Sequence, residues 1–183
     1  MSDIAMVNLM SDEIFHICYR AVGNEMIFKD EQDYFRGIFS LYEFNNSSAV
    51  SIWLRRQQRK QEKLLQGPTL QLDKRDVLVE IMAFCFMPNH IHLVLREVKE
   101  NGITKFMQKI GGGYAIYCNK KYKRKGHLFN RFKAFHIKND AQFKNVITYV
   151  HCNPLSIIEP GWKESGIKDT VKAIAFLTNE YRW

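Results

Sequence analysis

The chain of 183 residues is long enough for one domain with a full hydrophobic core, and 46% hydrophobic with 25% charged residues is the composition of a globular protein. No apolar run approaches the roughly 20 residues of a membrane span, and the four cysteines form no CxxC pair, which argues against a membrane protein, a zinc knuckle and a disulfide scaffold. We expect a single cytoplasmic domain over residues 1–183, with its core at about 13–158.

The first part of the chain predicts a strand, a helix and a basic insertion. Residues 13–20 alternate as a strand, with Phe15 facing the core and His16 on the other face. We expect His16 to be a sheet-surface residue without a catalytic role. Asp30 caps a helix over 33–42. The basic segment 45–72 is either a solvated insertion or a DNA contact.

A hairpin with two histidines follows. Residues 76–86 form one predicted strand, Pro88-Asn89 is turn chemistry, and residues 90–97 form the partner strand. Residues i and i+2 of a strand share a face, so His90 and His92 lie roughly 6.5 Å apart at their Cα atoms. Two imidazoles at that spacing suit one cation, and the alternative is a purely structural pair.

The second half predicts a helix over 104–122, a strand over 127–137 and a helix over 141–151, with a tail from 159 that ends in a helix over 169–181. We expect the three glycines 111–113 to bend the first helix or to admit another backbone or nucleic acid. Pro154 disfavours helical geometry at Asn153, which places Asn153 just past the helix end. Tyr149 and Asn153 are four residues apart and share one face.

The order strand, helix, strand, strand, helix, strand, helix is the ferredoxin-like βαββαβ pattern with an added helix, in the α+β class. It predicts a four-stranded antiparallel sheet with helices on one face, plus a C-terminal helix that carries Tyr149.

The net charge of +8 is concentrated in one segment, because residues 101–139 hold ten Lys or Arg and no Asp or Glu. Aromatic residues are interleaved with these cations, a combination that suits single-stranded nucleic acid. The alternative is a solvated basic face. The predicted DNA-binding residues are Lys120, Lys121, Lys123, Arg124, Lys125, Arg131 and Lys133.

The segment from Met87 to Leu95 (MPNHIHLVL) resembles the His-hydrophobe-His motif of single-tyrosine HUH transposases of the IS200/IS605 type. The segments GHLFNRFK, from Gly126, and YVHCNPL, from Tyr149, are similar to the REP-associated tyrosine transposases. Asn153 stands where insertion-sequence members use Gln, which matches that branch. The basic insertion 45–72 departs from the family's shorter pattern.

The resemblance implies that His90, His92 and Asn153 hold a divalent metal and that Tyr149 is the nucleophile. It implies Mg²⁺ or Mn²⁺, whereas imidazole chemistry alone also allows zinc or nickel. The implied activity is cleavage and rejoining of single-stranded DNA beside hairpin repeats through a 5′-phosphotyrosine. We expect core packing or base stacking for the competing tyrosines, which are Tyr114, Tyr117 and Tyr122.

The function, the oligomeric state and the origin of the partner histidines stay open at the level of sequence. The protein is a catalyst, a non-catalytic hairpin-binding module, or an RNA-binding protein. It is a monomer or a homodimer, and Tyr149 works with the histidines of its own chain or with those of a partner.

Overall fold

The computed structural model describes residues 13–65 and 75–178. Residues 1–12, the end of the insertion (66–72) and the end of the last predicted helix (179–181) lie outside that range. The elements in chain order are β1 (Ile14–Arg20), η1 (Val22–Asn24), α1 (Glu31–Phe44), α2 (Ile52–Leu65), β2 (Val79–Met87), β3 (His90–Glu97), α3 (Gly102–Tyr122), β4 (Lys133–Ile137), α4 (Asp140–Cys152), η2 (Asn153–Ile157), α5 (Trp162–Ser165) and α6 (Thr170–Leu177).

The four strands form one antiparallel sheet in the order β2-β3-β1-β4. The register pairs Ile17 with Leu93 and Cys18 with His92. This confirms the predicted α+β fold with a four-stranded antiparallel sheet and an added helix that carries Tyr149. Within the described residues, no helix is long and apolar enough to span a bilayer.

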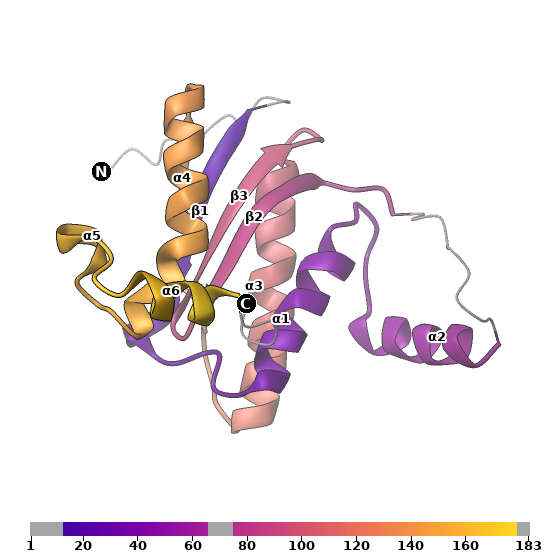
Figure 1. Ribbon diagram of the computed structural model, residues 1–183. Helices are drawn as coiled ribbons and strands as arrows, with labels where there is room; N and C mark the ends of the chain where they lie inside the picture. Colours follow the sequence, from indigo (N-terminus) through magenta and orange to yellow (C-terminus); the bar gives the residue numbers. More distant parts are fainter. Residues whose placement is uncertain (1–12, 66–74, 179–183) are drawn as a thin grey trace, which may run out of the picture.

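The two faces of the sheet carry different helices, and α3 and α4 lie on opposite sides of it (Figure 1). On one face, Ile91, Leu93 and Leu95 of β3 join α1 and α3 in the larger core. On the other face, Val94 packs with Val150 of α4 in a smaller apolar cluster. Because side chains alternate along a strand, His90 and His92 share the α4 face with Val94.

Helix α3 runs without interruption through its three glycines. A Cβ at Gly111 would lie 2.1 Å from the Tyr19 hydroxyl, and one at Gly113 would lie 2.2 Å from the Phe44 ring. Two of the glycines therefore admit side chains of β1 and α1, instead of a second backbone.

The last strand is shorter than predicted, since β4 begins at Lys133 and the expected strand begins at 127. The pairing of β1 with β4 stops at Cys18 and Lys133, although β1 itself continues to Arg20, so residues 127–132 lie outside the strand. They are instead pinned at single points, by a bridge between Ala21 and Phe129 and by a hydrogen bond of 3.0 Å from Asn130 N to Arg20 O.

The expectation that Pro154 removes Asn153 from helical geometry is wrong. Asn153 has φ −56° and ψ −37° and continues from α4 into η2. Proline is tolerated in the first turn of such a helix because its missing N–H has no intrahelical acceptor there. Asn153 is 1% exposed, and Pro154 and Leu155 of the same turn are buried with it.

Helix α2 carries most of the described part of the insertion and lies apart from the sheet (Figure 1). It is held to α1 by Glu43, whose carboxylate accepts 2.7 Å from Arg59 Nε and pairs with Arg55 at 3.5 Å. Arg56 and Arg59 also lie over the Phe39 ring. Three of its arginines are therefore used within the protein.

Candidate active site

His90 and His92 stand at the start of β3, directly after the Pro88-Asn89 turn. The turn is held by the segment that follows β1, because Ala21 N donates to Asn89 O at 2.9 Å and Ile27 N donates to Pro88 O at 2.7 Å. The two histidines are 9% and 3% exposed. Their rings lie 4.7 Å apart between centroids and are nearly perpendicular.

Helix α4 brings Tyr149 to the same place. Its ring stands edge-on to His92, with centroids 5.4 Å apart and an interplanar angle of 87°. Asn153, one helical turn later, is buried beside it. The structure thus brings together the histidine pair of a hairpin and the tyrosine of a helix more than fifty residues further along the chain, within one protomer.

Hydrogen bonds orient both imidazoles. His90 Nδ1 lies 2.6 Å from Asn89 Oδ1, and His92 Nδ1 lies 2.9 Å from His16 Nε2. An amide oxygen only accepts, so His90 carries its proton on Nδ1 and leaves the Nε2 lone pair available. With His16 Nε2 as acceptor, His92 takes the same tautomer.

The donor set fits a divalent metal. His92 Nε2 and Asn153 Nδ2 are buried and have no hydrogen-bond partner, which is uncommon for native polar atoms and calls for an explanation. The unpartnered imidazole nitrogen of His92 is a lone pair that a cation would complete, whereas Asn153 Nδ2 is a donor, and the Asn153 oxygen already accepts from Lys163 at 3.3 Å. In the described part of the chain, no group of three or more His, Cys, Asp or Glu suits a metal.

Burial keeps these imidazoles neutral. Desolvation, followed by the charges of Arg20 and Lys163, lowers the pKa of His90 to about 4. Desolvation together with the neighbouring His90 and His16 lowers the pKa of His92 to about 2. Metal binding requires the neutral imidazole, and both rings are therefore ready to bind at neutral pH.

His16 belongs to this cluster. It lies opposite the core face of β1, as predicted, but α4 covers that face, so His16 is no free sheet-surface residue. Its ring stacks on His92 at 5.1 Å and meets Tyr149 edge-on at 5.8 Å. Only the neighbouring position of β1 and β3 in the sheet, with their register, reveals this contact.

Lys163 is a second residue that the sequence did not single out. It lies in α5, and its Nζ donates to the Tyr149 hydroxyl at 3.2 Å and to Asn153 Oδ1 at 3.3 Å. The ammonium also lies 4.7 Å from the centroid of the Tyr149 ring. No motif marks this lysine in the sequence.

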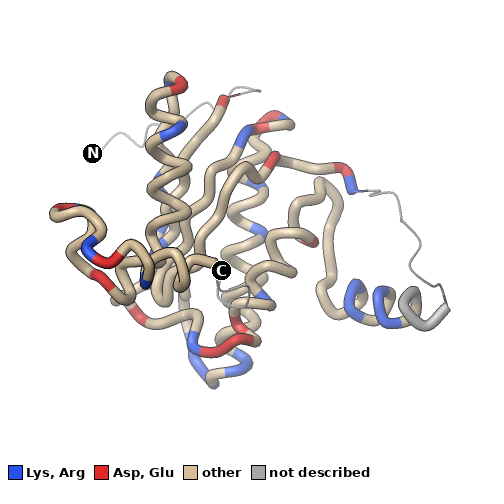
Figure 2. Tube along the Cα trace, viewed as in Figure 1, with Lys and Arg blue, Asp and Glu red and all other residues tan. Residues whose placement is uncertain are grey.

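Two of the predicted DNA-binding residues are used inside the protein. Lys121 pairs with Asp30 at 2.7 Å and with Asp33 at 2.8 Å, and Arg124 pairs with Glu25 at 2.5 Å. Basic and acidic residues accordingly lie side by side where the C-terminal end of α3 meets the start of α1 (Figure 2). The other predicted DNA-binding residues are exposed: Lys120, Lys123, Lys125, Arg131 and Lys133.

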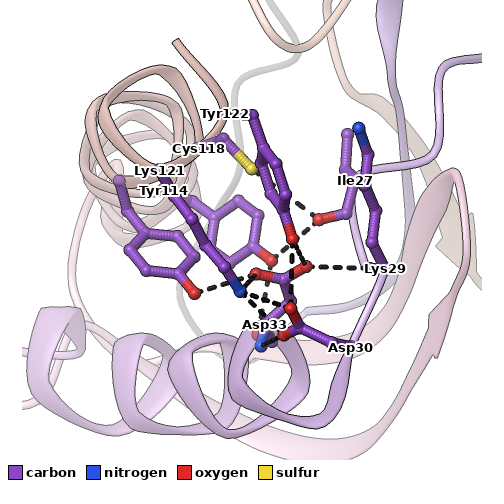
Figure 3. Close-up of polar contacts among 9 residues, drawn as sticks. Ile27, Lys29, Asp30, Asp33, Tyr114, Cys118, Lys121 and Tyr122 are labelled. Carbon is purple, nitrogen blue, oxygen red and sulfur yellow. Dashed lines mark hydrogen bonds and ion pairs between the residues drawn. The ribbon is translucent and has the colours of Figure 1, made fainter. Parts of the chain in front are cut away.

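The competing tyrosines lie on the other face of the sheet, around Asp33. Tyr114 is buried, and its hydroxyl donates to Ile27 O at 3.0 Å. Tyr117 and Tyr122 donate to the Asp33 carboxylate at 2.8 and 2.6 Å. Figure 3 shows Tyr122 and Lys121 pointing at this carboxylate from α3. The hydroxyl groups of all three tyrosines are therefore used in hydrogen bonds within the protein.

Comparison with known proteins agrees with the motifs. The family model described as "Transposase IS200 like" matches residues 72–153, and the resemblance to these transposases is confirmed. A search of curated proteins finds no match to this sequence.

Among solved structures, a REP-associated tyrosine transposase bound to a REP hairpin is similar in fold. The TM-score is 0.56 at 14% identity, over 88% of this chain and 76% of that one. A proposed transposase from Deinococcus radiodurans gives a TM-score of 0.43 at 14% identity, over 82% of this chain and 95% of that one.

Proposed function

We propose that this protein cleaves and rejoins single-stranded DNA beside hairpin or repeat sequences, with Tyr149 as the nucleophile. The observation that carries the proposal is the convergence of Tyr149 with two neutral imidazoles, of which His92 keeps a buried and unpartnered nitrogen. The family match and the hairpin-bound structure of similar fold support the choice of DNA.

The reaction follows from the tyrosine. The Tyr149 oxygen attacks the phosphorus while its phenolic proton passes to solvent, and the bond from phosphorus to the 3′-oxygen breaks as that oxygen takes up a proton from solvent. The products are a 5′-phosphotyrosine and a free 3′-hydroxyl. The covalent link keeps the energy of the phosphodiester, so that a 3′-hydroxyl attacks the phosphorus and releases Tyr149 without a nucleotide cofactor.

His90, His92 and Asn153 would hold the divalent metal, Mg²⁺ or Mn²⁺. When bound, the metal polarises the phosphate and stabilises charge on its oxygens. Neutral ligands leave the ion its full double charge for that purpose. His16 and Asn89 do not bind the metal themselves. His16 orients His92, and Asn89 orients His90, each through a hydrogen bond to the Nδ1 atom of the imidazole.

The test is capture of the covalent intermediate. Purified protein with Mn²⁺ is incubated with a labelled library of DNA hairpins whose single-stranded flanks are randomised, and SDS-resistant protein–DNA adducts are isolated and sequenced. We expect an adduct with the wild type and none with Tyr149→Phe. Tyr117→Phe is the matched control, because it removes a hydroxyl that serves Asp33 on the other face, and it should retain the adduct.

An adduct that persists in Tyr149→Phe would reject Tyr149 as the nucleophile. Hairpin binding without any wild-type adduct would leave a binding module, and preference for an RNA hairpin over its DNA copy would favour an RNA-binding protein.

A further inference from the structure

Lys163 is held against the site by its own short segment. Trp162 Nε1 donates to Ser156 Oγ at 3.0 Å, and Trp162 N donates to Glu159 O at 3.1 Å. These contacts fix α5 against η2, which follows directly from the helix that carries Tyr149. The backbone of Lys163 is consequently held in place by the contact between α5 and η2, although its side chain is exposed.

The ammonium of Lys163 is directed at Tyr149 and Asn153. Among the described residues, no carboxylate is recorded within ion-pair distance of it, whereas Lys99 and Lys121 both pair with carboxylates. Its polar contacts are the Tyr149 hydroxyl at 3.2 Å and Asn153 Oδ1 at 3.3 Å. A cation without an acidic partner, beside a phenol that is to carry negative charge, is placed for electrostatic catalysis.

We propose that Lys163 is a catalytic residue that donates a hydrogen bond to the Tyr149 oxygen in both directions of the reaction. This inference rests on the proposed function. During cleavage the oxygen approaches phosphorus with negative charge, and during rejoining the same oxygen leaves with negative charge as the bond to phosphorus breaks. The N–H group of Lys163 stabilises the charge on that oxygen.

The contact with Asn153 adds a consequence. Lys163 occupies the amide oxygen that the proposed metal needs, so the two cations compete for Asn153 Oδ1. The loss of Lys163 should therefore leave Mn²⁺ affinity unchanged or higher while the chemistry slows. A residue that merely supports the site would lower both.

The experiment compares Lys163→Met, which keeps the length of the side chain without its charge, with Lys163→Arg and with Lys168→Met in the same tail. A suicide hairpin gives the single-turnover rate of adduct formation, and addition of a 3′-hydroxyl strand to the purified adduct gives the rate of rejoining. Binding of the uncleaved hairpin, Mn²⁺ affinity from the EPR signal of the free ion, and thermal unfolding are measured alongside.

We expect Lys163→Met to slow cleavage and rejoining by a similar factor of about 100, with Mn²⁺ affinity unchanged or higher and unfolding unchanged. Lys163→Arg should recover most of the rate, and Lys168→Met should resemble the wild type. Wild-type rates in Lys163→Met, or rates that fall only as Mn²⁺ affinity falls, would overturn the role of Lys163 alone. Absence of a wild-type adduct would overturn the proposed function and this inference with it.

Discussion

Two buried polar clusters, one on each face of the sheet, differ in whether their groups find hydrogen-bond partners. On the α1 and α3 face, Asp33 is fully buried and its carboxylate accepts hydrogen bonds from Lys121, Tyr117, Tyr122 and Lys29 N at 2.6 to 2.8 Å. Burial alone would raise the pKa of Asp33, but these hydrogen bonds lower it. On the α4 face, His92 Nε2 and Asn153 Nδ2 are equally buried and have no partner.

The two clusters differ in what they contribute to folding. A satisfied polar cluster joins two helices and uses every donor that faces it, and it therefore contributes to folding. An unsatisfied one costs folding free energy, and a metal bound at His92 Nε2 would supply the partner that this lone pair lacks. The first arrangement explains the tyrosines that compete with Tyr149. Unpartnered buried atoms also occur away from Tyr149, at Arg36 Nε, Ser40 Oγ and Glu97 Oε2, so it is the contact of His92 with Tyr149 that marks the site.

The largest expected effect on activity is at His92, on the α4 face of the sheet. His92→Gln removes the free imidazole nitrogen, and we expect adduct formation to fall at least about 100-fold because the metal loses a ligand. The unfolding midpoint should change by only a few degrees. Adduct yields on the selected hairpin and differential scanning calorimetry measure both, with His136→Gln on the exposed edge strand as the control. Activity within tenfold of the wild type would contradict a metal role for His92.

The converse effect is expected at Asp33. Asp33→Ala leaves Lys121 and two hydroxyls without their shared acceptor, and the free energy of unfolding should fall by about 2–4 kcal/mol. The cleavage rate of the folded fraction should be unchanged. Urea unfolding measures the loss.

Asp30→Asn is the matched control for Asp33→Ala, since it keeps the cap of α1 and removes only a half-exposed charge, worth at most about 1 kcal/mol. Equal losses in the two variants would remove the contrast between buried and exposed carboxylates.

A smaller effect is expected at His16. His16→Ala removes the acceptor that fixes the tautomer of His92, and Mn²⁺ affinity should fall by about 10- to 100-fold, as for other residues that orient a metal ligand. Isothermal titration calorimetry gives the affinity. His16→Gln retains a hydrogen-bond acceptor and should lose less. Unchanged Mn²⁺ affinity in His16→Ala would reduce His16 to a packing role.

The smallest effects test how closely the other face is packed. Gly112→Ala meets no atom within 4 Å and should stabilise α3 by about 0.5–1 kcal/mol through helix propensity. Gly113→Ala brings a Cβ into the buried Phe44 ring and should destabilise the fold by about 1–2 kcal/mol. Urea unfolding of both variants measures the difference, and equal shifts would mean that the Phe44 ring yields to the new methyl group.

Much of the fold was predictable because its signals are local. Period-two alternation located β1, the Pro-Asn turn located the hairpin of β2 and β3, Asp30 caps α1 as expected, and the order of the elements indicated the sheet. The errors arose where a distant partner decides the outcome. The β1–β4 pairing stops at Lys133, although β1 continues to Arg20, and Asn153 is helical and buried despite the proline that follows it.

The sequence by itself determined the histidine pair on one face of a strand and the tyrosine with asparagine on one face of a helix, because side-chain periodicity follows from backbone geometry alone. Only the tertiary structure decided that these faces meet, that His16 and Lys163 join them, and that Lys121 turns to Asp33. Those contacts depend on strand order, register and helix packing, which join residues that no spacing along the chain connects.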